Sequence, residues 1–530
     1  MLPTSLPGRI PAFAVGILFG ALPLLPGGNG GAQELPWLES GQLRLDFAPR
    51  FWSWDTRFGL RTVDGTIVEE AEPLGLDLTA DPLGREIMPH LADLEAHLQD
   101  ALTESAFRAR LGTSRAEVDK AVLTFPLRLE VGVTDWLTLG TTVPFVRPRT
   151  EITFALLADS TSANVGLSPQ LTNAGAVSQF LTGFQGAIDE ARAVDPGNAV
   201  VAEAQAYIDA LTNAYGQGTV FPHTESATGA ALQERLDVLR LSLEELGATG
   251  IPTSLPLAQQ YLAGEQFQTL LGSQAIQAFP LTDFTEPWTL GDVEVTAGLR
   301  LFRRGFRPDS LGDLPTLRYQ VGAGLLLRLG TGTPDDPSRF LDVGSGDGQT
   351  DVEASLFGLT EVGSHFNAWA RVRYGVQQEG ERTRRIAAPE QALPGVERLA
   401  PLRWTPGNYL ELDLAPRLQL TDAMAVGFRY HLWSKGEDTY GLAPMTGDRP
   451  DATETLPPAD LLQRETEETL HELGFSVAYS TMEAHARGEA SIPVHIRFNV
   501  FRPLTGSGGR TPRGARIVAG LSLYRDLWGG

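Results

Sequence analysis

The sequence contains no cysteine and only two lysines, Lys120 and Lys435, among its 530 residues. The lack of cysteine excludes disulfide bonds and thiolate chemistry along the whole chain. Lysine and arginine together number 42 against 65 aspartates and glutamates, and the net charge is -23. Because phosphate binding requires clustered basic side chains, this balance predicts no nucleic-acid partner. Nearly all the basic side chains are guanidiniums, which pair with carboxylates in a planar fork.

Long apolar runs are lacking beyond the N-terminus. No segment after residue 32 has the ~18 unbroken apolar residues that a membrane helix requires. Residues 1–32 predict a cleaved signal peptide, because Arg9 precedes an apolar run that is short and broken by proline and glycine. The small residues Gly30 and Ala32 place the predicted cleavage before Gln33. If the mature chain, 33–530, is embedded in a membrane, it must cross with strands.

A strict two-residue alternation runs through Tyr409–Trp433. Leucines from Leu410 to Leu420 alternate with polar residues, and a second alternating run begins at Met424 after a very short turn. Such alternation places the apolar side chains on one face of a sheet. Both runs exceed the usual ~5 to 6 residues of a strand and reach the roughly 9 to 11 that a membrane strand needs. The segment therefore predicts a hairpin of a transmembrane β-barrel.

Twelve segments show this two-residue period. They are 41–54, 122–133, 137–149, 290–302, 315–330, 349–359, 364–378, 406–420, 424–435, 469–479, 490–502 and 513–527. Their connections alternate between long and short, as expected for the external loops and periplasmic turns of bacterial barrels. Tryptophans near the segment ends resemble aromatic girdles: Trp54, Trp288, Trp404 and Trp433 at the external side, Trp136 and Trp528 at the periplasmic side. We predict an all-β membrane protein, a twelve-stranded antiparallel transmembrane β-barrel over 33–530, with a large helical extracellular insert.

Two external connections have helical periodicity. In the predicted helical extracellular loop 55–121, apolar residues from Ile87 to Leu102 recur at helical spacing, and Ser114 with Glu117 matches a capping box. The larger insert, 150–288, contains three or four amphipathic stretches punctuated by proline and glycine. Their apolar faces require burial. The insert can form a cap over the barrel mouth or a plug within the lumen, and the sequence leaves both open.

The strand count decides which face meets lipid. Twelve strands leave room inside for water or a plug, so the leucine and valine face is predicted to point into lipid and the charged face into the lumen. The predicted lumen-lining residues are Asp292, Glu294, Arg300, Arg318, Arg328, Asp351, Glu353, Glu411, Asp413, Arg417, Arg429, His495 and Arg497. Arg44, Asp46, Arg50, Arg128, Glu130, Arg371 and Arg373 share this face. Opposed guanidiniums and carboxylates would pair across strands and narrow the pore.

The loop Thr331–Asp351 is dense in aspartate and glycine. Asp335, Asp336, Asp342 and Asp347 are calcium candidates, because calcium takes six to eight oxygen ligands. Their spacing does not match an EF-hand, and the same residues are common in external turns. The glycines in this loop lack the helix and lysine of a phosphate cradle, and we expect no cofactor.

A barrel phospholipase with a His-x-Ser pair is a further alternative. None of the eight histidines has a serine two positions later. A nucleophile and base that meet only in the folded chain would leave no such spacing. We predict that the protein is not an enzyme.

Three segments resemble a known family: EVGVTDWLTLGTTVPFV (130–146), LGDVEVTAGLRLF (290–302) and the strand–loop–strand 327–356. They resemble the outer-membrane, transporter-like proteins of the MetA-pathway-of-phenol-degradation family. The resemblance covers roughly the barrel half of the chain, and the insert 150–288 departs from it. It implies a β-barrel that passes or binds small, often hydrophobic, molecules.

The first hypothesis is a channel or transporter for passive passage of small, hydrophobic solutes through the outer membrane of a Gram-negative-type bacterium. Its expected partners are outer-membrane lipid, the solute and, during biogenesis, the barrel-assembly machinery. A structural or surface-interaction protein whose insert binds a partner is the alternative from another class. A secreted β-sandwich with helical decorations is the third, although arginines at the centres of long strands argue against it.

Overall fold

The computed structural model describes residues 37–63, 66–102, 107–217, 219–306, 317–444 and 456–528. The predicted signal peptide, 1–32, lies outside the described residues. Among the helices of the described chain, none is long and apolar enough to cross a membrane.

Twelve antiparallel strand positions close into a barrel, which confirms the predicted fold class. The first position consists of β1 (Gln42–Phe47) and β2 (Arg50–Trp54). The others are β5 (Thr113–Thr134), β6 (Leu137–Leu157), β11 (Val293–Phe306), β12 (Leu317–Leu329), β13 (Asp351–Val362), β14 (Phe366–Gln377), β17 (Tyr409–Gln419), β18 (Met424–Lys435), β20 (Glu468–Ser480), β21 (Val494–Ser507) and β23 (Ala515–Asp526). Closure comes from β1 and β2, which both pair with β5 on one side and β23 on the other.

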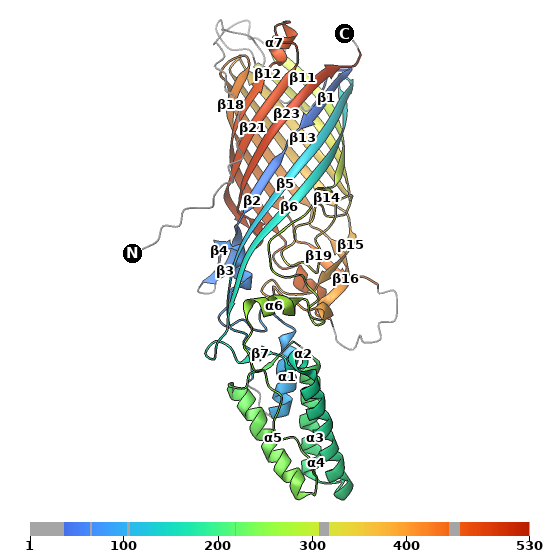
Figure 1. The fold of residues 1–530 in the computed structure, drawn as a ribbon. Coiled ribbons are helices and arrows are strands. Elements are labelled where there is room, and N and C mark those ends of the chain that lie inside the picture. The colour runs from blue at the N-terminus through green and yellow to red at the C-terminus, as the bar shows by residue number, and fades with distance from the viewer. Residues whose placement is uncertain are drawn as a thin grey trace, which may run out of the picture.

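The two ends of the barrel differ. Short connections and the described C-terminal residues lie at one end, named the turn end, together with the small helix α7 (Met482–Ala486). Long connections lie at the other, named the loop end (Figure 1). This arrangement matches the short turns and long external loops of bacterial barrels.

Apolar side chains cover the outside of the barrel wall. Exposed members include Val295, Leu325, Leu327, Val352, Leu356, Val372, Leu410, Leu414, Leu418, Phe428, Phe475, Ile496 and Phe498. The alternate positions carry buried polar groups such as Arg44, Asp46, Glu130 and Asp413. An exposed apolar band around a polar interior is the pattern expected of a barrel in lipid.

The hairpin of β5 and β6 is longer than predicted, with 22 and 21 residues. Its outer part projects past the barrel at the loop end (Figure 1). Ser114 therefore lies in a strand, and the predicted capping box is wrong. The reason is tertiary: Val118, Ile152 and Leu156 continue the inward face of the hairpin and are buried against helices.

These helices form the cap, defined here as α1 (Leu91–Leu102), β7 (Val165–Leu167), α2 (Pro169–Thr172), α3 (Ala174–Val194), α4 (Ala199–Gly216), β8 (Val220–Pro222), α5 (Ala227–Glu245) and α6 (Gly264–Leu271). Side-chain caps begin several of them, as where Ser226 Oγ accepts from Gly229 N at 3.0 Å. Their apolar faces share one core that includes Phe184, Leu211 and Leu236. The cap stands beyond the loop end and outside the lumen (Figure 1).

Smaller sheets complete the loop end. They contain the hairpin β3 (Thr56–Val63) and β4 (Thr66–Pro73) with β22 (Thr511–Pro512), and a sheet of β15 (Gly380–Arg385), β16 (Leu399–Thr405) and β19 (Thr439–Leu442). Short 3-10 helices, Leu74–Leu78, Val396–Arg398 and Ala459–Leu462, and strands β9 (Phe284–Thr285) and β10 (Thr289–Leu290) accompany them.

The range 55–121 is thus not helical throughout, since α1 is the only α-helix among the residues of this range that the structure describes. The sequence pair Asp64 and Gly65 between β3 and β4 is a strong hairpin signal, which the helical prediction overlooked.

The tryptophans divide into two groups. Trp136, Trp288 and Trp528 are exposed, as the girdle prediction requires. Trp54 and Trp404 are buried instead. The remaining one, Trp433, lines the lumen and stacks on Tyr409 with ring centroids 4.6 Å apart. The girdle interpretation is wrong for these three. A residue near a strand end can also be buried against the loop-end structure or face the lumen, and its position in the strand does not distinguish these cases from contact with lipid.

The outward face gives a stability prediction. Leu356 lies mid-strand in β13 and is 60% exposed. Leu356→Arg places a guanidinium in the hydrocarbon core and is expected to lower the free energy of unfolding in phospholipid vesicles by ~2–4 kcal/mol. The matched control, Leu442→Arg in β19 beyond the barrel, is expected to change it by less than about 0.5 kcal/mol. Equal effects of the two substitutions would contradict lipid contact at Leu356.

We expect the stability of the cap to depend on pH through His90. Burial, with help from the nearby Arg398, lowers the pKa of His90 to about 4, whereas an unfolded histidine has a pKa of about 6.5. Between these values the unfolded chain binds more protons, so cap stability is expected to fall as pH drops from about 6.5 to about 4, by roughly 3 kcal/mol. Urea titrations followed by circular dichroism at 222 nm measure this, because nearly all described helix is in the cap. His90→Leu should flatten the acid slope, while His97→Leu in α1, the helix that begins directly after His90, should retain it.

Candidate functional site

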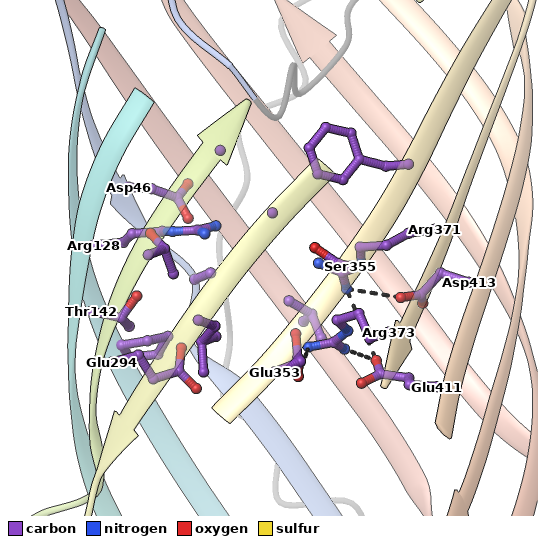
Figure 2. A pocket seen from close by; sticks show the side chains of 18 of the residues that line it. Asp46, Arg128, Thr142, Glu294, Glu353, Ser355, Arg371, Arg373, Glu411 and Asp413 are labelled. Atoms are coloured by element: carbon purple, nitrogen blue, oxygen red, sulfur yellow. Dashed lines mark hydrogen bonds and ion pairs between the residues drawn. The ribbon is translucent and has the colours of Figure 1, made fainter. Parts of the chain in front are cut away.

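The barrel encloses a cavity of about 470 Å³. Ten arginines line it, against six carboxylates and one histidine. The arginines are Arg44, Arg50, Arg128, Arg328, Arg371, Arg373, Arg417, Arg429, Arg497 and Arg516; the carboxylates are Asp46, Glu130, Glu294, Glu353, Glu411 and Asp413, and the histidine is His431. Figure 2 shows Asp46, Arg128 and Glu294 on one side of this cavity, facing Glu353, Arg373 and Glu411 on the other.

Each of the six carboxylates contacts a guanidinium. On one side, Arg497 Nη2 lies 2.9 Å from Asp46 Oδ2, and Arg44 Nε donates to Glu130 Oε2 at 2.7 Å. Arg328 Nη2 donates to Glu294 Oε1 at 3.2 Å and its Nη1 to Asp351 Oδ2 at 2.9 Å.

The opposite side is a denser network. Asp413 accepts from Arg371 at 2.8 Å and from Arg429 at 3.2 Å, and its Oδ1 lies 3.1 Å from His431 Nδ1. Arg373 contacts both Glu353 and Glu411. The sheet register brings these groups together, since Arg371 pairs with Asp413 and Arg373 with Glu411 across neighbouring strands. Buried carboxylates are tolerated here because each has a charged partner.

Glu411, Asp413 and His431 are close enough together to ligate a metal ion. However, guanidiniums of Arg371, Arg373 and Arg429 already contact the two carboxylates. A divalent cation would face their repulsion at short range. The chemistry of this donor set is therefore a neutralised ion network and not a metal centre.

Aromatic rings alternate with guanidiniums along the lumen wall. The guanidinium carbons of Arg371 and Arg429 lie 5.3 and 5.5 Å from the Trp369 ring. Those of Arg429 and Arg516 lie 5.6 and 4.5 Å from the Phe501 ring. We name the series Arg371, Trp369, Arg429, Phe501 and Arg516 the cation–π ladder. All five residues line the cavity, and they come from β14, β18, β21 and β23.

Eight of the thirteen predicted lumen residues line the cavity: Glu294, Arg328, Glu353, Glu411, Asp413, Arg417, Arg429 and Arg497. The other five, namely Asp292, Arg300, Arg318, Asp351 and His495, do not. Asp351 is held by Arg328, and His495 is fully buried in β21. Arg300 and Arg318 lie toward the turn end, where Arg318 is 4.0 Å from Glu361. Asp292 anchors the loop 330–350 by accepting from Gly332 N and Asp347 N.

The four calcium candidates are not brought together into a ligand group in the described chain. Asp335 pairs with Arg384, Asp336 caps Ser338 N, and Asp342 accepts from Asp336 N. Burial opposes ionisation of Asp335, but the Arg384 guanidinium outweighs it and lowers the pKa of that carboxyl. Burial raises the pKa of Asp347. These contacts hold the loop in place.

Sequence reasoning missed several lumen residues. Arg516 contacts Glu472 and faces inward, and the alternation of its strand could have identified both. His431 shares the polar face of β18 and was recoverable in the same way. The lumen-facing rings Phe357, Trp369 and Phe501 carried no such signal, because an aromatic residue suits either face.

The segment preceding β1 occupies the turn end of the lumen. Trp37 and Leu38 are both 2% exposed. Trp37 Nε1 donates to Gln320 Oε1 at 3.1 Å, and its ring lies 5.3 Å from that of Phe357. Gly322 allows this approach, since a Cβ there would come within 2.7 Å of the Trp37 ring. Trp37 therefore narrows the lumen between the charged cavity and the turn end.

At the loop end, Arg385 ties three segments together. Its guanidinium is buried and donates to the carbonyls of Pro337, Ile276, Gln277 and Pro394 at distances of 2.5–2.9 Å. These carbonyls belong to the loop 330–350, to the chain after α6, and to the connection between β15 and β16. One side chain thus couples the base of the cap to two loops of the barrel mouth.

A closed antiparallel barrel with an apolar outside, a charged inside and unequal ends is the architecture of a bacterial outer-membrane β-barrel. Among solved structures, an outer membrane channel from Pseudomonas putida F1 is similar over 94% of this chain and 100% of its own, with 9% identity and a TM-score of 0.40. The Ralstonia pickettii toluene transporter TbuX is similar over 93% and 90%, with 8% identity and a TM-score of 0.26. The translocator domain of autotransporter NalP from Neisseria meningitidis is similar over 92% and 90%, with 7% identity and a TM-score of 0.29.

At these TM-scores the similarities carry no conclusion about the solute. No protein-family model and no curated protein matches the chain. The resemblance to the MetA-pathway family therefore stays a prediction.

Trp37 gives a prediction for the lumen. Trp37→Ala removes the ring that fills the turn end and is expected to raise single-channel conductance severalfold in planar bilayers, because the constriction widens. Trp528→Ala, at an exposed tryptophan of the same end, serves as the control. An unchanged conductance in Trp37→Ala would place the limiting constriction elsewhere.

Proposed function

We propose that this protein is an outer-membrane channel for passive passage of small solutes. The observation that carries the proposal is the space inside the barrel: a cavity of about 470 Å³ lined by charged side chains and enclosed by an apolar outer wall. Polar interiors of this kind accompany water-filled lumens in outer-membrane barrels. The solute gradient would supply the driving force.

In this proposal the lumen charges have an electrostatic role and no catalytic one. The carboxylates that a hydrolase would use as base or nucleophile are each held by an arginine. Rings of paired charges tune which ions and solutes pass a constriction. His431 lies between Asp413 and Glu472 and completes this network.

The proposed location is the outer membrane, reached through the signal peptide predicted at 1–32 and the barrel-assembly machinery. The proposed external face is the loop end, so that the cap lies outside the cell. Arg385 couples the cap base to the mouth loops, which supports a role of the cap in restricting the entrance.

Reconstitution of the purified chain into planar bilayers tests the proposal. Discrete current steps are expected, together with heat-modifiable migration on gels of the outer-membrane fraction. A chain that inserts in folded form but carries no current and passes no solute in liposome-swelling assays would refute passive transport.

A variant at the mouth sharpens the test. Arg385→Met leaves buried carbonyls without a donor, at a cost of roughly 1–3 kcal/mol for each such group. The mouth loops should then loosen, and flicker and mean conductance should both rise. The control is Arg403→Met in the neighbouring strand β16, where the arginine is half exposed and pairs with Glu379. If Arg385→Met and Arg403→Met show the same flicker and mean conductance, the coupling through Arg385 does not control the entrance.

One observation favours the second candidate, a surface-interaction protein. Val238 and Leu241 of α5 are 50% and 54% exposed, and Val194 at the end of α3 is 68% exposed. Apolar side chains exposed on a cap offer points of contact for a partner. A closed lumen in every conductance assay, with a ligand that binds the cap, would favour this function over transport.

A further inference from the structure

We infer that the lumen holds a binding site for a small aromatic carboxylate of the benzoate class. The inference rests on the proposed function, because it names the solute class of the same lumen. It combines three observations: an excess of guanidiniums, one arginine that has no partner among the described residues, and the cation–π ladder.

Positive charge is in excess in the lumen. The chain as a whole carries a net charge of -23. Ten arginines and six carboxylates nevertheless line the cavity, and two further carboxylates, Asp351 and Glu472, contact Arg328 and Arg516 from outside the lining, so guanidiniums exceed carboxylates by two. A cationic solute would be repelled there, whereas an anion would be attracted across a wall of low dielectric constant.

Arg50 is the arginine that is available to a solute. It lines the cavity, is exposed within it, and makes no hydrogen bond or ion pair with another residue of the described chain. Its electrostatic surroundings contain the guanidiniums of Arg429, Arg497 and Arg516, with Glu294 as an opposing charge. A carboxylate at this position would accept two parallel hydrogen bonds from the planar fork of Arg50.

The ladder ends beside this arginine, since Arg50 pairs with Val518 of β23 and Arg516, two residues from Val518 on the same inward face, belongs to the ladder. Trp369 and Phe501 provide aromatic faces, and the guanidinium planes between them also stack on aromatic rings. A solute ring can therefore pack against the ladder while its carboxylate meets Arg50. A neutral hydrocarbon would use the rings but displace water from guanidiniums that it cannot pair with. An inorganic anion would use the guanidiniums alone.

The site also suits passage. Successive guanidiniums and rings along the wall form several weak sites, and permeation requires binding that is favourable enough for entry and weak enough for release. The cavity volume lies within the ~300–1,000 Å³ typical of small-molecule sites. Such a solute keeps a hydrophobic body, so the site refines the hydrophobic solute expected from the sequence.

The test measures binding and passage separately. Sodium benzoate is titrated calorimetrically into the full-length chain in detergent. Cyclohexanecarboxylate, which has the charge without an aromatic ring, and benzyl alcohol, which has the ring without the charge, are the comparison probes. Benzoate is expected to bind more tightly than cyclohexanecarboxylate, and benzyl alcohol should not bind measurably.

Arg50→Gln is expected to weaken benzoate binding about tenfold or more, because a charge-assisted hydrogen bond is lost. Trp369→Leu should weaken benzoate severalfold and leave cyclohexanecarboxylate unchanged. Arg318→Gln, an arginine at the turn end outside the cavity, is the matched control and should bind as the parent does. Arg50→Lys retains the charge without the fork and should fall between Arg50→Gln and the parent, which separates a binding effect from a folding defect.

Lack of benzoate binding by the parent chain, equal binding of benzyl alcohol, or equal affinities in Arg50→Gln and Arg318→Gln would each overturn the inference. Bilayer reversal potentials in gradients of potassium chloride and potassium benzoate then address passage. Benzoate binding with the expected variant pattern but without current would refute the proposed channel and leave the anion site standing. Current without benzoate binding would support the proposed channel and overturn the benzoate site.

Discussion

Closure of the hydrogen-bonded sheet is the constraint on which the rest of the structure depends. In lipid, every backbone amide and carbonyl must be paired within the protein, and a closed barrel achieves this by removing both sheet edges. Here β1 and β2 complete the ring between β5 and β23. Once the ring is closed, successive side chains of each strand point alternately to lipid and to the lumen. Charged side chains are unfavourable in lipid and therefore occupy the lumen-facing positions.

The interior is then stabilised by pairing charges across neighbouring strands. Asp413 is buried among Arg371, Arg429 and His431, and its register partner on β14 is one of these arginines. Such a network stiffens the wall, because removal of one partner leaves another charge buried. The same pairing determines which arginines remain available to bind an anionic solute. Structure and selectivity thus draw on the same set of side chains.

The two-residue period was sufficient to predict the strands and the inward face, as Glu411 and Asp413 illustrate. It could not predict depth along the barrel axis: Arg318 and Glu353 have the same inward pattern, yet only Glu353 lines the cavity. Nor could it predict tertiary partners. The outer part of β5 has a helical signature at Ser114 and Glu117, but the cap core turned that segment into strand. Trp37 precedes any periodic segment, so its place in the lumen had no local signal.

The long hairpin of β5 and β6 has a consequence for assembly. Apart from one register shift between Gly132 and Thr134 beside the turn, a single ladder runs from the barrel wall to the cap, with Val118 opposite Ile152. A slip of one residue in the barrel wall would rotate these side chains to the opposite face. The cap core would then lose its apolar contacts from the hairpin. Burial of Val118 and Ile152 in the cap core therefore favours one register of the β5–β6 hairpin, so that folding of the cap and strand pairing in this part of the wall depend on each other.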